Sequence, residues 1–159
     1  MEVVRANLPL HVYRYIDITV ERIRHLEELR ICSLGVIVRL VQVEDTNTPE
    51  IIRFLLETQT FPICLRCIDV GSELAKKGAA FVVTQILMSK DGQQYIGMFP
   101  NRFYGVAVVL RKTVDRFGRN QPNSELLKQI LNCYMQLVEV SRLFSSEIKS
   151  LEVLLIECS

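Results

Sequence analysis

The sequence lacks a long uninterrupted apolar run. Hydrophobic residues make up 49% of the 159 positions, but Arg, Lys, Glu or Asp interrupts every long run before the roughly 20 residues that cross a bilayer. Residues 1–10 include Glu2 and Arg5 and lack the apolar core and small-residue cleavage site of a signal peptide. We therefore expect a soluble protein without a signal peptide and without a membrane partner.

Strong charge of one sign and the short motifs of catalysis are also missing. The 19 basic and 18 acidic residues give a net charge of +1, which does not favour strong nonspecific attraction to nucleic acid. The sequence contains no GxGxxG, P-loop, HExxH or GxSxG pattern. Asp17 and His25 lie in a polar connection without an obvious nucleophile. We expect no catalytic residue, no cofactor and no enzymatic activity.

The cysteines do not form a recognisable disulfide or metal framework. They are an odd number, five, scattered through apolar helical positions: Cys32, Cys64, Cys67, Cys133 and Cys158. Cys64 and Cys67 form a single CxxC, but zinc needs two further ligands, and His11 and His25 lie far upstream. A redox CxxC is expected between a strand and a helix, whereas this one lies in a helical pattern. We expect buried, reduced thiols and no metal site.

Helical periodicity is the main positive signal, and no segment alternates like a strand. The apolar residues of Glu28–Val43 cover most of a helix circumference, which predicts a helix packed between neighbours. Thr48 and Pro49 predict the start of the next helix. The remaining boundaries are predicted at Gly71-Ser72, at a turn over Lys90–Gly92, at Pro100, and at Asn123 or Ser124.

Two segments repeat the same order of helices, short, intermediate and long. Thr48–Met88 and Lys90–Val138 each follow this order over about 40 residues, the layout of armadillo repeats. We therefore expect an all-α fold, an armadillo-type right-handed helical solenoid in a single domain over residues 1–159. The approximate repeats are 8–43 (partial), 48–88, 90–138 and 140–158 (partial). The first and last repeats are incomplete, so Leu8, Val12 and Tyr13 are expected to expose an apolar patch that favours self-association or docking.

Several blocks of sequence resemble a known family. They are Leu34–Ile37, Pro62–Arg66, Gly71–Lys76, Gln85–Leu87, Arg102-Phe103, Leu126–Lys128 and Cys133-Tyr134. In these blocks, from about Pro9 to Arg142, the chain resembles the Rcd-type cell-differentiation proteins, the armadillo subunit (subunit nine) of the CCR-NOT deadenylase complex. The resemblance implies a non-catalytic scaffold in the cytoplasm and nucleus, which docks on the NOT scaffold subunit and recruits regulators for mRNA decay and translational repression. Compared with the family, the chain is expected to be N-terminally truncated and divergent.

The resemblance also implies two binding surfaces. One is a groove along the third helices that receives short helical motifs of regulators, and the other is a set of convex pockets that accept tryptophans. The corresponding residues are Lys77, Gly78 and Gln85 in the groove, and Pro100, Arg102 and Arg142 at a convex pocket. Gly78 stands at the central apolar position of the groove, and Pro100 stands where the family has an aromatic residue.

Other interpretations of these residues stay open. Gly78 also suits close helix packing, and Arg102 also suits an exposed charge at a helix start. Basic residues on the third helices give a second hypothesis, a groove that binds nucleic acid weakly: Arg39, Lys76, Lys77 and Lys128. A third hypothesis is a truncated, non-functional paralogue.

Overall fold

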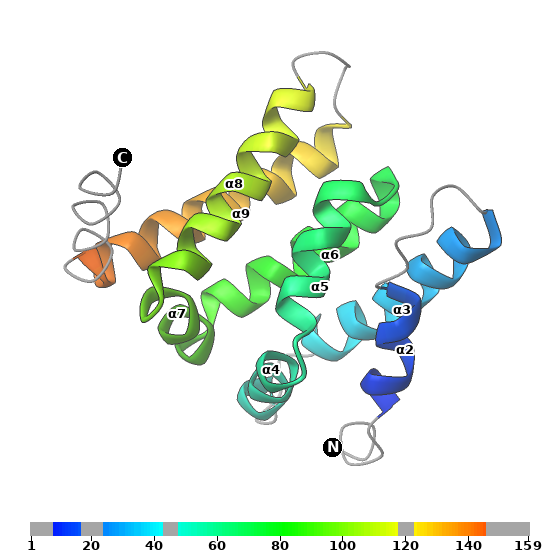
Figure 1. Cartoon of the computed structure of the whole chain (residues 1–159), viewed down its shortest axis with the longest axis horizontal. Helices are drawn as coiled ribbons and strands as arrows, with labels where there is room; N and C mark the ends of the chain where they lie inside the picture. The colour runs from blue at the N-terminus through cyan, green and yellow to red at the C-terminus, as the bar shows by residue number, and fades with distance from the viewer. Residues whose placement is uncertain (1–7, 17–23, 43–47, 118–122, 146–159) are drawn as a thin grey trace.

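The computed structural model describes residues 8–16, 24–42, 48–117 and 123–145, which form eight α-helices and no strand (Figure 1). The helices are α2 (Leu8–Ile16), α3 (Arg24–Gln42), α4 (Thr48–Glu57), α5 (Thr60–Val70), α6 (Glu73–Met88), α7 (Lys90–Gly97), α8 (Pro100–Phe117) and α9 (Ser124–Leu143). The prediction of an all-α fold is confirmed. None of these described helices is both long and apolar enough to cross a membrane.

The helices stack on one another at a regular interval along the chain. Helix α3 packs on α6 and α6 on α9, α2 packs on α5 and α5 on α8, and α4 packs on α7. Figure 1 shows α4 and α7 along one edge, with the pairs α2/α3, α5/α6 and α8/α9 following one another across the molecule. Each helix thus contacts the equivalent helix of the neighbouring unit, which is how a helical solenoid buries its apolar faces. The predicted helical solenoid is confirmed.

Side-chain caps fix two of the predicted helix boundaries. The Ser72 hydroxyl accepts a hydrogen bond from the Ala75 amide at 3.3 Å and begins α6. The Asn123 side-chain oxygen accepts one from the Glu125 amide at 2.9 Å and begins α9. Helix α8 begins at Pro100, as predicted. These caps satisfy amides that have no partner within their helix. Helix α9 continues to Leu143, beyond the predicted end at residue 138.

The corner between α6 and α7 is tighter than the sequence indicated. The prediction of a turn over Lys90–Gly92 was wrong, because these residues are the first turn of α7 and only Ser89 separates the two helices. The Ser89 hydroxyl accepts a hydrogen bond from the Gly92 amide at 3.0 Å and donates one to the Ile86 carbonyl at 2.7 Å. A Cβ on Gly92 would lie 1.8 Å from that carbonyl oxygen. Glycine is therefore required by close backbone approach, and not by an unusual backbone angle.

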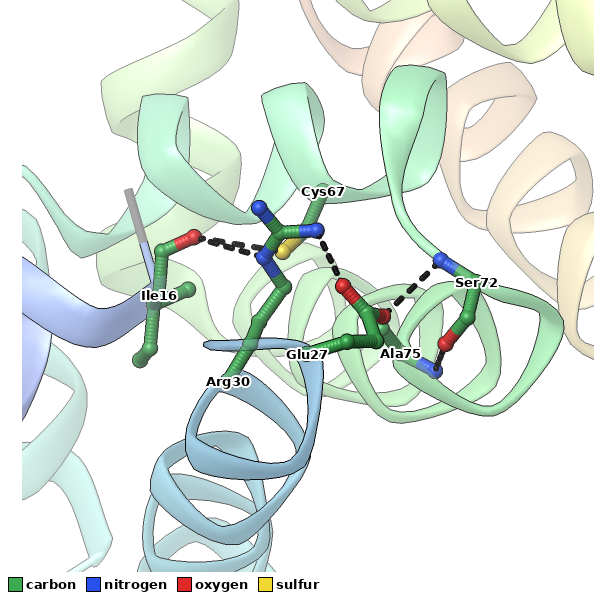
Figure 2. Close-up of polar contacts among 6 residues, drawn as sticks. All are labelled: Ile16, Glu27, Arg30, Cys67, Ser72 and Ala75. Atoms are coloured by element: carbon green, nitrogen blue, oxygen red, sulfur yellow. Dashed lines mark hydrogen bonds and ion pairs between the residues drawn. The ribbon is translucent and has the colours of Figure 1, made fainter. Parts of the chain in front are cut away.

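The first unit is held to the second by a buried polar cluster at the end of α2 (Figure 2). The Arg30 side chain, 8% exposed, donates from Nε to the Ile16 carbonyl at 3.2 Å and from Nη1 to Glu27 Oε2 at 2.5 Å. The other Glu27 oxygen accepts a hydrogen bond from the Ser72 amide at 3.0 Å. Cys67 also reaches the Ile16 carbonyl, at 3.7 Å. This Arg30–Glu27 cluster joins α2, α3 and the α5–α6 corner.

The expected apolar patch at the start of the chain is not formed by Tyr13. Its side chain is buried, and its hydroxyl shares a hydrogen bond with the Thr58 hydroxyl at 2.7 Å. The prediction was wrong for this residue because α2 packs on α5 and places Tyr13 next to the α4–α5 connection. The side chains of Leu8 and Val12 lie outside the described residues.

We predict that Glu27→Ala destabilises the fold by about 2–4 kcal/mol, because it leaves the buried Arg30 guanidinium without its carboxylate and the Ser72 amide without its acceptor. Urea unfolding followed by circular dichroism measures the change. Glu28→Ala, at an exposed position of the same helix, is the matched control and should cost less than about 1 kcal/mol. Equal effects of the two substitutions would contradict the role assigned to the cluster.

Candidate functional site

The groove residues predicted on α6 do not form a single patch. A Cβ on Gly78 would lie 3.7 Å from Val38 Cγ2 and 3.8 Å from Leu34 Cβ, so this position faces α3. Gln85 follows two helical turns later and lies on the same face of α6, half-buried. Lys77 is directed to the other side and pairs with Glu125 at the start of α9. The structure therefore places Gly78 and Gln85 together and Lys77 apart from them.

The lysines of α6 are engaged with neighbouring helices. The Lys77 ammonium donates a hydrogen bond to Glu125, and this bond together with the lysine charge lowers the pKa of Glu125. Burial lowers the pKa of Lys76, and the nearby Arg116 charge lowers it further. Arg116 itself pairs with Asp69 at 2.7 Å. These contacts reduce the positive charge that α6 offers to a ligand.

Arg102 lines a surface hollow between α4, α7 and the start of α8. Its guanidinium carbon is 3.7 Å from the centroid of the Tyr95 ring and 4.4 Å from that of Phe99. Its Nη1 atom donates a hydrogen bond to the Tyr95 carbonyl at 3.0 Å. The hollow has a volume of about 350 Å³ and is lined by Arg53, Leu56, Glu57, Asp91, Gln94, Tyr95, Met98, Phe99 and Arg102. We refer to it as the Arg102 hollow.

Two interactions hold the walls of the Arg102 hollow in place. Arg53 on α4 and Asp91 on α7 form an ion pair at 3.2 Å between Nη2 and Oδ2, which links the two short helices. The Tyr95 ring packs edge to face against the buried Phe61, with 6.0 Å between the centroids. Tyr95 is therefore held against the core by Phe61, and Arg102 lies over its ring. The apolar rings and the cation are positioned before any ligand arrives.

A second hollow adjoins the first. It has a volume of about 540 Å³, is lined by Lys90, Gln93, Gln94, Met98, Leu143 and Phe144, and shares Gln94 and Met98 with the Arg102 hollow. Arg142 precedes Leu143, but its own side chain is exposed and pairs with Glu139 at 2.7 Å. Pro100 begins α8 and lies two residues from Arg102. Neither Pro100 nor Arg142 is among the residues that line these hollows, so of the three predicted pocket residues only Arg102 does.

The CxxC cysteines are part of the core of α5. Cys64 and Cys67 are free and buried, and burial raises the pKa of Cys64 well above its usual range. Burial likewise raises the pKa of Cys133 to about 11. Cys32 is exposed on α3, so the expectation of buried thiols was wrong at this position; Cys158 lies outside the described residues. Among the described residues there is no group of three or more His, Cys, Asp and Glu that could hold a metal ion.

Sequence reasoning missed most of the residues that form the Arg102 hollow. Tyr95, Met98 and Phe99 come from α7 and the connection to α8, while Arg53 comes from α4. The spacing of Tyr95, Phe99 and Arg102 is compatible with one helical face, but a helix break at Pro100 separates them. In the sequence, two aromatic residues and an arginine lie close to Pro100. The repeat pattern alone does not identify them as residues of one site.

The fold and these surfaces define an all-α helical solenoid with hollows on its surface. The chain belongs to the Rcd1-like cell differentiation family, whose model matches residues 1–155. It is 39% identical over 133 residues to protein CAF40 of Saccharomyces cerevisiae, which covers 84% of this chain and 35% of that protein. It is also 39% identical over 141 residues to cell differentiation protein rcd1 of Schizosaccharomyces pombe, covering 86% and 47%. The chain therefore spans less than half the length of either relative.

We predict a pH-dependent contribution of Glu125 to stability. Its pKa is lowered in the folded state, so the stabilisation is present above the ordinary value of 4.5 and is lost as the pH falls through the lowered pKa. Glu125→Gln should therefore lower the urea midpoint at neutral pH and have little effect in strong acid. The same substitution in a Lys77→Met background should lose this pH dependence. A difference that persists unchanged in that background would contradict the pairing.

Proposed function

We propose that this chain is a non-catalytic scaffold that recruits regulators to a CCR-NOT type deadenylase complex, in the cytoplasm and nucleus. Membership of the Rcd1-like family and the helical solenoid support this proposal. The three-helix units 48–88 and 90–138 would be armadillo repeats, with partial repeats over 8–43 and 140–158. The NOT scaffold subunit would be one partner, and regulators with helical or tryptophan-containing motifs would be the others.

The observation that carries the proposal is the geometry of the Arg102 hollow. A planar guanidinium stacked beside two aromatic rings offers a flat, cationic surface to the electron-rich face of an indole. Met98 and Leu56 supply apolar walls, as in most pockets for compact ligands. The family resemblance expects an aromatic residue at position 100, and the neighbouring Phe99 supplies a ring in its place. The Phe99 ring therefore supports the proposal that the hollow still recognises tryptophan, although position 100 is a proline.

A groove for helical motifs would run along the third helices α3, α6 and α9. Gly78 and Gln85 would lie at its α3 side, where the absence of a side chain at Gly78 leaves room above Val38. Lys77 would contribute to the α9 side, next to Glu125. An amphipathic helix laid on this surface would be held mainly by apolar burial.

Weak binding of nucleic acid is less well supported. Lys77 is already paired with Glu125, and Lys76 is partly buried. Arg116, the basic neighbour of Lys76, is paired with Asp69. Scaffold binding should change little with salt, whereas binding of nucleic acid would fall steeply as counterions compete.

We predict that Arg102→Ala weakens binding of a tryptophan-containing GW-repeat peptide by roughly 2- to 30-fold, which corresponds to the loss of a cation–π contact of about 0.5–2 kcal/mol. Arg111→Ala is the matched control, because Arg111 is exposed on the same helix outside the hollow. Isothermal titration with the parent and both variants measures the difference. Equal affinities for the parent and Arg102→Ala, or an equal loss in Arg111→Ala, would contradict this site.

A second test addresses the groove. Gly78→Glu should abolish binding of an amphipathic helical regulator peptide, because its carboxylate would be desolvated under the peptide without a partner. Gly78→Ala is the control: its Cβ makes only ordinary contacts with Val38 and Leu34, so binding should persist and stability should rise by about 0.5–1 kcal/mol. Fluorescence anisotropy and thermal unfolding measure the two effects. If Gly78→Glu binds like the parent, the groove does not include this position.

A further inference from the structure

One carboxylate that lines the Arg102 hollow is free to bind a ligand. The hollow is lined by two acidic side chains, Glu57 and Asp91. Asp91 is held by Arg53 in the ion pair that links α4 to α7. Glu57 is exposed, and its carboxylate forms no hydrogen bond or ion pair within the part of the chain that the structure describes. Glu57 therefore offers the hollow an anionic hydrogen-bond acceptor that no other side chain uses.

The place of Glu57 in α4 is unfavourable for a carboxylate. Glu57 is the last residue of α4, where the helix dipole has its negative end and disfavours a further negative charge. Arg53 lies one turn earlier, at a spacing that allows contact with Glu57, but its guanidinium pairs with Asp91 on α7. A hydrogen-bond donor on a bound ligand would stabilise the Glu57 charge, which the fold itself leaves without a partner.

The other oxygen acceptors of the hollow are weaker candidates. The Tyr95 carbonyl already accepts a hydrogen bond from Arg102 at 3.0 Å. The Gln94 amide and the Tyr95 hydroxyl also belong to residues that line the hollow, but both groups are neutral. Hydrogen bonds to an ionised acceptor are roughly twice as strong as those between neutral groups. A donor on a ligand should therefore bind Glu57 in preference to Gln94 or Tyr95.

We propose that Glu57 selects tryptophan over phenylalanine by accepting a hydrogen bond from the indole N–H. The inference rests on the proposed recognition of tryptophan at the Arg102 hollow. Indole is planar and its N–H lies at the ring edge, so the ring can place one face on the Arg102 guanidinium while its edge points to a neighbouring wall. An aromatic side chain without this donor binds less tightly, because the Glu57 carboxylate then loses water without compensation.

The test compares two peptides that differ only in the donor. One is a short glycine-flanked peptide with a single tryptophan, and the other carries 3-benzothienylalanine, in which sulfur replaces the indole N–H. Isothermal titration of the full chain should show at least about 5-fold tighter binding of the tryptophan peptide, through one hydrogen bond to a charged acceptor. Because the chain contains no tryptophan, a blue shift of the peptide's fluorescence reports directly that the indole is bound.

Substitutions at the acidic residues of α4 assign the preference to one side chain. Glu57→Met should reduce the affinity ratio of the two peptides to less than about 2-fold, because a thioether is a weak acceptor. Glu57→Gln keeps a neutral oxygen acceptor and should give an intermediate ratio. Glu50→Met is the matched control, since Glu50 is exposed in the first turn of α4 and does not line the hollow. It should keep the ratio of the parent chain.

The possible failures are distinguishable. Equal affinities of the parent chain for the two peptides would overturn the role of Glu57 and leave tryptophan recognition intact. Failure of both peptides to bind would overturn the proposed site together with this inference. A preference that is lost in Gln94→Met or Tyr95→Phe, but kept in Glu57→Met, would assign the hydrogen bond to a different acceptor and would likewise overturn the inference.

Discussion

Helix α6 is the constraint on which the described fold depends. It packs against α3, α5 and α9, so its side chains are buried on several sides. Ala75, Ala79 and Ala80 keep the helix narrow enough for these neighbours to approach, and larger residues there would force them apart. The positions of α3 and α9, and hence of the third-helix surface, follow from this packing. The hydrogen bond between the Thr84 hydroxyl and the Cys133 thiol adds a polar contact inside an otherwise apolar interface.

The outer hollow is a consequence of how α6 ends. Because Gly92 lets the α7 backbone lie directly on the Ile86 carbonyl, α7 turns away immediately after Ser89 and stacks on α4. That stacking brings Arg53 next to Asp91 and leaves Tyr95 half-buried, with Arg102 over its ring. Gly92 does not line the Arg102 hollow, but the hollow depends on it because Gly92 sets the corner between α6 and α7. The proposed function relies on this corner as much as on the residues that line the hollow.

Several charged side chains of the described residues connect neighbouring helices. The Arg30–Glu27 cluster joins the first unit to the second, Lys77–Glu125 joins α6 to α9, and Arg116–Asp69 joins α8 to α5. Paired charges offer less attraction to a polyanion, while aromatic and apolar side chains remain accessible at the hollows and on α9.

The sequence by itself determined the helices, most of their boundaries and the stacking of equivalent units, because periodicity, caps and proline act over a few residues. It also singled out Arg102. Only the tertiary structure decided that Gly78 faces α3, that Lys77 pairs across to α9, and that Tyr95, Phe99 and Arg53 join Arg102. It also decided that Cys32 is exposed and Tyr13 buried. These outcomes depend on which helices meet and at what angle, and residues distant in sequence set that geometry through close packing.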